Sequence, residues 1–269
     1  MRLINRRPGR ELGVVLAALP FVLVVLAYFV ASEARLAANP DDKLLPSLGA
    51  MAEAMAAMAF EPDRRTGDLL LWVDTLASLQ RLLTGIAVAA ALALVVGVTM
   101  GLLPLAGAAL SPFTAVVAMI PPLAVLPILF IALGLGEVSK IALITIGTAP
   151  MLIRDMAFRV AELPHELLVK AQTLGASTLQ IAVRVVVPQV LPRLLSALRL
   201  AIGPAWLFLI AAEAIASTEG LGYRIFLVRR FLAMDVILPY VAWITLLAFV
   251  MDRLLALADR RLNPWAHVR

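Results

Sequence analysis

Residues able to do chemistry are few in this chain of 269 residues. Cysteine is absent, which excludes disulfides, thiolate metal sites and cysteine nucleophiles. The two histidines, His165 and His267, lie far apart, so a zinc site of familiar spacing cannot be drawn. A membrane-embedded enzyme would need a cluster of histidine or acidic residues at helix ends, and the sequence offers none. We therefore predict no catalytic residues and no metal site.

The lysines exclude one common route to ATP hydrolysis. A phosphate-binding loop needs a glycine directly before its lysine, so that backbone amides and the ammonium group hold the phosphates together. The three lysines follow other residues: Lys43 follows Asp42, Lys140 follows Ser139 and Lys170 follows Val169. The chain therefore cannot hydrolyse ATP by this route.

The composition places the chain in a membrane. Hydrophobic residues make up 62% of it and charged residues 15%, against about 45–50% and 25% in soluble domains. The net charge of +5 comes from scattered basic residues, most of them arginine. Basic cytoplasmic loops explain this excess better than a nucleic-acid-binding surface does.

Six charge-poor segments are candidates for crossing a bilayer, which takes about 20 apolar residues. The stretch from Leu82 to Gly136 has no charged residue and must fold back, and Pro104 and the Ser111–Pro112 pair mark its break. Prolines in lipid need neighbours that satisfy the freed carbonyl groups, so we expect the proline-rich third span inside a bundle. We predict an all-α membrane protein with spans at residues 12–32, 82–103, 113–133, 138–153, 195–216 and 236–252.

The charges between these spans predict the orientation. Four arginines precede the first span, whereas segment 33–80 carries eight acidic and four basic residues. Because basic residues collect on the cytoplasmic side, the N-terminal tail 1–11 is expected inside. Segment 154–193 and the C-terminal tail 266–269 then lie inside as well. Segment 218–235, with three arginines and two acids, fits its outer position less well.

Span five alone carries charges in its interior, Arg199 and Glu213. Each could extend its charged group towards the lipid headgroups. Alternatively, Glu213 lies at the mouth of a translocation path, because ionisable groups in membranes are costly and persist for function. Trp206 follows Arg199 two turns later on the same helix face, where the pair could line a path for an anion or pack a dimer interface. Glu213, Trp206 and Arg199 are the candidate path residues.

The segment after span four contains specific helix signals. Pro164 suits the first turn of a helix, and Gly175 suits a left-handed cap at its end. Ser177 and Gln180 form a capping box that starts a second helix, which Pro188 ends or kinks. Both helices are amphipathic, so the segment is either a docking element or a loop that covers the inner end of the bundle.

This segment resembles the cytoplasmic signature loop of permease subunits from bacterial ATP-binding-cassette importers. The family consensus is Glu-Ala-Ala, three residues, Gly, and then a hydrophobic residue and Pro at fixed distances. Ala171 matches the last alanine, Gly175 the glycine, Val185 the hydrophobic position and Pro188 the proline. The consensus Glu and first Ala fall on Val169 and Lys170, so no contact is assigned to a glutamate there.

Nearly the whole chain, about residues 12–265, resembles the subfamily that imports nitrate, taurine, alkanesulfonates and related small solutes. The matching motifs are "LLPS" at 44–47, "TLASLQRLLTG" entering span two, "MIPPLAVLPILFIALGLGE" in span three and "AAEAIASTEGLGYRI" from span five outward. In such systems selectivity lies largely in a separate binding protein, so the resemblance implies a solute class and not one solute.

The resemblance also implies a fold and partners. The fold is that of a type I importer permease with cytoplasmic coupling helices, in the bacterial inner membrane. The partners are a second permease, expected here as a homodimer, two ATPase subunits that bind ATP and Mg²⁺, and a periplasmic solute-binding protein. By this resemblance the ATPase would bind the loop in a groove and rotate the two helix bundles against each other as rigid bodies. The expected contact residues are Phe158, Leu167, Ala171, Leu174, Gly175 and Pro188.

A secondary transporter or channel that works alone is the alternative. It would need coupling acids in mid-membrane, which these spans hardly offer.

Overall fold

The computed structural model describes residues 9–40 and 42–267, and every regular element within them is a helix. Parts of both predicted tails, residues 1–8 and 268–269, lie outside the described residues. The longer helices are α1 (Arg10–Ala38), α3 (Leu70–Leu92), α5 (Pro104–Val117), α7 (Glu137–Ala161), α10 (Val187–Ala216) and α12 (Met234–Leu262). The shorter ones are α2 (Leu48–Phe60), α4 (Val98–Leu102), α6 (Pro122–Leu133), α8 (His165–Thr173), α9 (Thr178–Ile181) and α11 (Leu221–Val228).

Two of these helices continue into others through single π-helical turns. Ala93–Gly97 joins α3 to α4, and Ala182–Val186 joins α9 to α10. Among the described residues, five helical stretches are long and apolar enough to cross a membrane, and the bent pair α5 and α6 would make a sixth. The predicted all-helical fold is confirmed, and the predicted number of six spans is reached when the bent pair counts as one span.

The third predicted span is broken rather than straight. α5 and α6 meet at 94°, because Pro121 and Pro122 occupy the cap and the first position of α6, where proline lacks the amide that would continue the preceding helix. The expected break at Pro104 is found between α4 and α5. The break expected at Ser111–Pro112 is wrong, since both residues lie inside α5.

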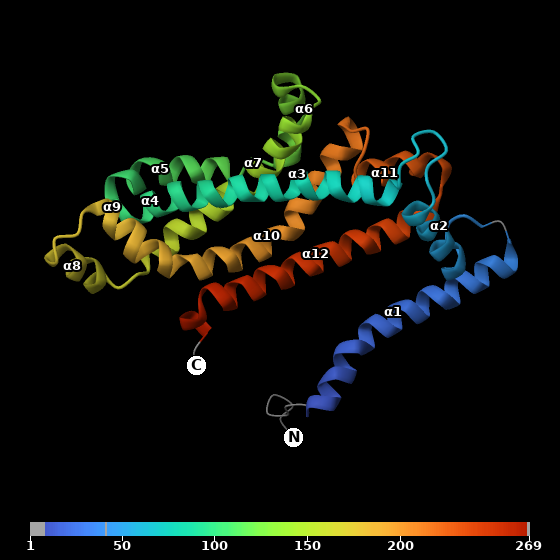
Figure 1. The fold of residues 1–269 in the computed structure, drawn as a ribbon, viewed down its shortest axis with the longest axis horizontal. Coiled ribbons are helices and arrows are strands. Elements are labelled where there is room, and N and C mark those ends of the chain that lie inside the picture. The colour runs from blue at the N-terminus through green and yellow to red at the C-terminus, as the bar shows by residue number, and fades with distance from the viewer. Residues whose placement is uncertain (1–8, 41, 268–269) are drawn as a thin grey trace.

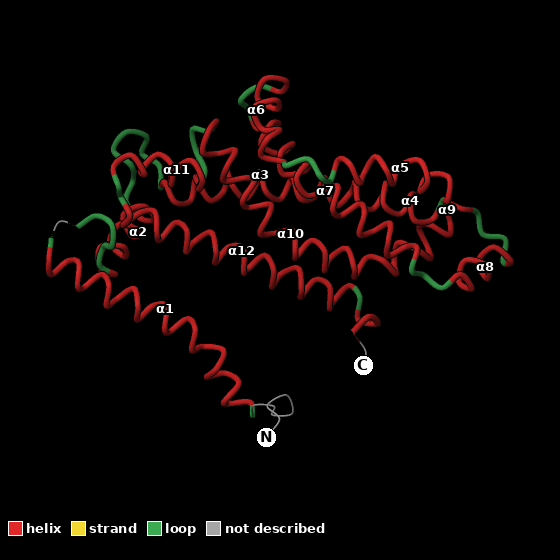
Figure 2. The backbone as a smooth tube through the Cα atoms, turned by 180° about the vertical axis from the view of Figure 1, so that it is seen from behind, coloured by secondary structure: helices red, strands yellow, loops and turns green. Residues whose placement is uncertain are grey.

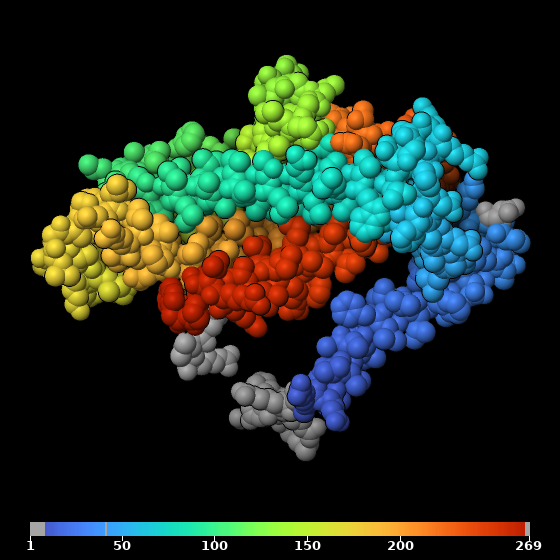
Figure 3. All heavy atoms as spheres, in the orientation of Figure 1, coloured from blue at the N-terminus to red at the C-terminus, as the bar shows by residue number. Residues whose placement is uncertain are grey.

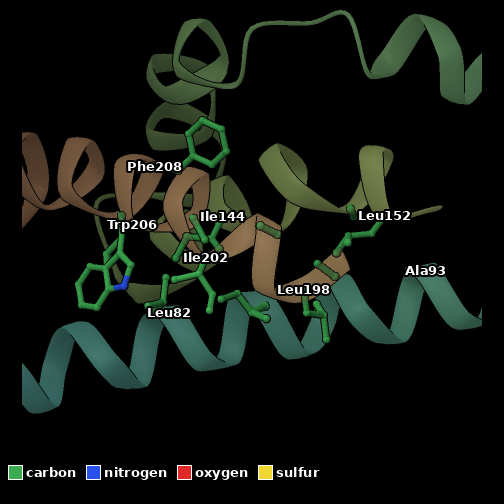
Figure 4. Packing of buried hydrophobic residues seen from close by; sticks show 14 of the residues in the cluster. Leu82, Ala93, Ile144, Leu152, Leu198, Ile202, Trp206 and Phe208 are labelled. Carbon is green, nitrogen blue, oxygen red and sulfur yellow. The ribbon is translucent and has the colours of Figure 1, made fainter. Parts of the chain in front are cut away.

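The core of the bundle lies between α3, α7 and α10. Leu82 of α3, Ile144 of α7 and Ile202 of α10 meet there with at most 4% of their surface exposed, as Figure 4 shows. In Figure 1 these helices run side by side along the long axis, with α8 at one end and α11 at the other. The long helices therefore connect the two ends of the bundle.

Two helices project from this bundle. Figures 1 and 2 show α6 standing across its long axis and α1 leaning away from it, and Figure 3 shows α1 touching the rest only near α2. The joint is the "LLPS" motif: Tyr28 Oη donates to the Pro46 carbonyl (2.6 Å), and Ser32 Oγ donates to the Leu45 carbonyl (2.9 Å). Ser47 caps α2 by accepting from the Ala50 amide (3.1 Å).

Glycines let α3 and α4 approach α7 closely. A Cβ atom added at Gly97 would lie 2.8 Å from the Ile153 carbonyl oxygen, and one at Gly101 would lie 2.6 Å from the Ala157 carbonyl oxygen. The GxxxG pair thus packs helix against helix, as such pairs do in membranes.

Gly101→Ala is therefore expected to destabilise the chain by about 1–3 kcal/mol, because overpacking against backbone cannot be relieved by a side-chain rotation. The matched control is Gly203→Ala in α10, where an added Cβ would meet nothing within 4 Å and helix propensity favours alanine by up to about 1 kcal/mol. Thermal unfolding in detergent measures both. Equal stability of the two variants would contradict the close approach of α4 and α7.

Candidate functional site

The corner between α8 and α9 has the geometry that the sequence predicts. Gly175 adopts φ +78°, a left-handed conformation that favours glycine. Its amide donates to the Gln172 carbonyl (2.9 Å), and the Ala176 amide donates to the Ala171 carbonyl (3.1 Å). These two bonds are those of a Schellman motif. Ser177 and Gln180 then form both halves of the predicted capping box.

The predicted docking residues of this corner divide into two groups. Ala171 faces inward, where it packs against the core together with Leu168, and Leu167 is half-buried. Leu174, by contrast, is 89% exposed, and Leu179 of α9 is 73% exposed. An apolar tip therefore projects from this end of the bundle.

The two remaining docking candidates lie away from the corner. Pro188 does not end its helix, because the π-helical turn Ala182–Val186 carries the chain on into α10. Phe158 is still helical, since α7 extends to Ala161 and not to the expected boundary at 153. Its ring is 58% exposed.

Phe158 lines a hollow of about 950 Å³ on one side of the bundle. Its walls come from α4, α5, α7, α10 and the start of α6, and include Met100, Ser111, Thr114, Arg154, Asp155 and Phe208. Arg154 is exposed. Most of the lining is apolar, with a few polar groups, one arginine and one aspartate, which is typical of a site for a small ligand.

A dense ion-pair cluster lies at the opposite end from α8. We call it the Arg81 cluster; its members are Arg81, Glu137, Lys140, Glu213 and Glu219. Arg81 Nε and Nη2 donate to the two carboxylate oxygens of Glu137, the second at 2.9 Å. Arg81 Nη1 donates to Glu213 Oε1 (2.8 Å) and to the Glu219 carbonyl (2.9 Å). Lys140 Nζ donates to Glu137 Oε1 (2.8 Å). One arginine of α3 thus joins α7, α10 and the turn after α10.

The burial of this cluster is graded. The side chains of Arg81 and Glu213 are 3% and 0% exposed, whereas those of Glu137 and Glu219 are 54% and 48% exposed. Buried ions lose their hydration and need partners with good geometry. The bidentate Arg81–Glu137 contact supplies that geometry.

The turn between α10 and α11 is held by side chains of α3 and α10. The Gly220 amide donates to Asp74 (2.9 Å), the Leu221 amide to Ser78 Oγ (2.8 Å) and the Gly222 amide to Glu213 (2.8 Å). These are the amides that a helix leaves unpaired at its start. Gly220 has φ +122°, and a Cβ there would lie 2.5 Å from the Glu213 carboxyl group. The turn needs glycine for both reasons.

The three predicted path residues do not share one exposed face. Glu213 is fully buried in the Arg81 cluster, so the interpretation that it reaches towards the headgroups is wrong. Trp206 is 3% exposed, and its Nε1 has no hydrogen-bond partner among the residues that the structure describes. Arg199 is partly exposed and binds Asp252 of α12 with two bonds, at 2.7 and 3.0 Å.

The sequence contained a signal for the Arg81 cluster. Three of the four matching motifs each supply an ionic member: Arg81 in "TLASLQRLLTG", Glu137 at the end of "GLGE" and Glu213 in "AAEAIASTEGLG". Charged residues in otherwise apolar motifs predict buried partners for one another. The motifs are far apart in the chain, so only the fold identifies the pairs.

Known proteins match the chain over most of its length. The family model described as "Binding-protein-dependent transport system inner membrane component" matches residues 85–264. The taurine transport system permease TauC of Escherichia coli K12 is 39% identical over 199 residues, which cover 74% of this chain and 72% of TauC. The bicarbonate transport system permease CmpB of Synechocystis is 30% identical over 196 residues, covering 72% of this chain and 70% of CmpB.

A solved structure agrees on the fold. The inward-facing methionine transporter MetNI matches with a TM-score of 0.64 at 19% identity, over 72% of this chain and 97% of the matched chain. The sequence comparison and the structure comparison both match subunits of ATP-binding-cassette transporters. The chain belongs to the family of binding-protein-dependent transport system inner membrane components, the permeases of ATP-binding-cassette importers.

Proposed function

We propose that this permease, paired with a second copy, carries a small polar or anionic solute inward, driven by separate ATPase subunits that bind ATP and Mg²⁺. A periplasmic solute-binding protein delivers the solute. The permease relatives for taurine and bicarbonate support a solute of that class, and nitrate belongs to the same class by size and charge.

The observation that carries this proposal is the apolar tip of the α8–α9 corner. Leu174 and Leu179 are exposed on a corner whose backbone is rigidly capped. A short amphipathic helix with an unburied apolar side is the form that a groove on a partner recognises. Gly175 supports the docking role by setting the turn, and Ala171 supports it by packing α8 against the core. Leu167 is half-buried on the same helix.

The hollow beside Phe158 is our candidate for the inner part of the pathway. Arg154 is an exposed cation on its wall, next to the half-buried Asp155 of the same wall, and would bind the anionic group of a solute. Glu213 and Trp206 are buried within one chain, so a wall position for them is less well supported than one for Arg154 and Phe158. Arg199 is part of the bundle's ion pairing with α12.

The proposed orientation places α8 and both termini in the cytoplasm. Basic residues are in excess in segment 154–193 and acidic residues in segment 33–80, which supports this orientation by the positive-inside rule. The Arg81 cluster and α11 then lie at the periplasmic side, where the binding protein docks.

Reconstitution tests the proposal. The permease, its ATPase subunit and its binding protein are placed in liposomes, and uptake of radiolabelled taurine, a sulfonate, bicarbonate and nitrate is followed with and without ATP. We expect uptake of one of these solutes that requires ATP and all three proteins. Uptake by the permease alone, without ATP, would instead establish the stand-alone transporter or channel.

A further inference from the structure

The helices on either side of the docking corner are tied together at their far ends. α7 leads into the corner, and α10 leaves it through α9 and a π-helical turn. At the opposite end, Glu137 is the first residue of α7, and Glu213 lies three residues before the end of α10. Both carboxylates bind the same guanidinium group, that of Arg81. Figure 1 shows the course of the two helices, with α8 and α11 at opposite ends of the bundle.

The two helices contain points where they can bend. Pro150 interrupts the hydrogen bonds of α7, and Pro192 and Pro204 interrupt those of α10. Proline and π-helical turns are the usual sites of helix bending. A displacement applied at the corner could therefore be absorbed by independent bending of α7 and α10 before it reached the other end.

The Arg81 contacts restrict independent movement of α7 and α10 at this far end of the bundle. The guanidinium group is planar and donates in a fixed fork, so its two bonds to Glu137 fix an orientation as well as a distance. Its third contact, to Glu213, is buried and supported by Ser78 Oγ, which lies 2.8 and 3.0 Å from the two carboxylate oxygens. We call the contacts of Arg81 with Glu137 and Glu213 the Arg81 joint. This joint is buried and stiff on the α10 side and exposed to solvent on the α7 side.

We propose that Arg81 is a positioning residue for transport, which locks the far ends of α7 and α10 to α3 so that displacement of the α8–α9 corner moves both ends as one body. The role rests on the proposed function, because it requires an ATPase that moves the corner. It differs from simple stabilisation in its consequence: loosening the joint separates ATP hydrolysis from solute movement while the protein stays folded.

Two variants loosen the joint in different ways. Arg81→Lys keeps the positive charge and loses the fork. Glu137→Gln acts on the half-exposed acid and leaves the buried Arg81–Glu213 pair in place, so the chain keeps its fold even if Arg81→Lys does not. The matched control is Arg224→Lys. Arg224 also donates through two of its nitrogens to a carboxylate, that of Asp74, but this contact joins α11 to α3 and not α7 to α10.

The experiment uses the complete reconstituted transporter and measures solute taken up per ATP hydrolysed, together with ATPase co-purification and basal ATPase activity. For Arg81→Lys we expect normal co-purification, basal hydrolysis within about twofold of the unmodified protein, and at least a tenfold lower uptake per ATP. For Glu137→Gln we expect the same pattern with a smaller loss, and for Arg224→Lys an unchanged ratio.

Three outcomes would overturn the proposal: an unchanged ratio in both test variants, an equal loss in the Arg224→Lys control, or a loss of uptake that only follows the amount of folded protein. Failure of the proposed function itself is recognised separately, because the unmodified transporter would then show no ATP-dependent uptake.

Discussion

Leu174→Asp is expected to weaken binding of the ATPase subunit by at least about tenfold. Leu174 is 89% exposed at the α8–α9 corner, so the chain itself gains nothing from its apolar surface. Fully burying a leucine side chain in a partner's groove contributes about 1.5–3 kcal/mol, and a tenfold change in affinity corresponds to about 1.4 kcal/mol. An aspartate at this position loses that contribution and also brings a charge into the groove. Titration of purified permease with purified ATPase subunit measures the effect.

The matched control for this variant is Gln172→Asp. Gln172 lies near the end of α8, two residues before the cap residue Leu174, and is also exposed. The change introduces the same charge without removing apolar surface. We expect its affinity for the ATPase to stay within about threefold of the original, as a peripheral charge changes binding only modestly. Equal losses in the two variants would show that the local charge matters and the apolar tip does not.

Local signals in the sequence were enough to predict this corner. The cap at Gly175 and the capping box of Ser177 and Gln180 each depend on residues within a few positions of one another, and the structure contains all of them. The sequence does not predict as well which way each side chain points. Ala171 and Leu174 were both predicted to contact a partner, but which of them faces the core depends on where α8 lies against the bundle.

The buried charges show where prediction from hydropathy fails. Glu213 lies near the end of an apolar span, a position that is equally compatible with the membrane surface and with the interior of a bundle. Its environment is decided by Ser78 and Arg81, which precede it by more than a hundred residues in the chain. The sharp bend between α5 and α6 is similar, because Pro121 and Pro122 predict a break without predicting its angle.

Asp74→Ala is expected to destabilise the chain by about 3–5 kcal/mol, the usual effect of removing one partner from a buried ion pair. Asp74 is fully buried, and it accepts from Arg224 Nε (2.7 Å), from the Gly220 amide (2.9 Å) and from Tyr240 Oη (3.3 Å). Alanine removes the acceptor for all three donors and leaves Arg224, whose side chain is 13% exposed, without its counter-charge. Thermal unfolding of the purified permease in detergent measures this change.

Asp252→Ala provides the comparison that separates burial from pairing. Asp252 also binds an arginine through two oxygens, but the side chains of Arg199 and Asp252 are 36% and 32% exposed. Ion pairs that remain accessible typically contribute less than about 1 kcal/mol, because solvent compensates each charge when its partner is lost. A much larger loss for Asp74→Ala than for Asp252→Ala would show that enclosure by α3, α11 and α12 makes the Asp74 contacts indispensable. Similar small losses would mean that water reaches Asp74, and that the turn before α11 opens in the membrane-bound protein.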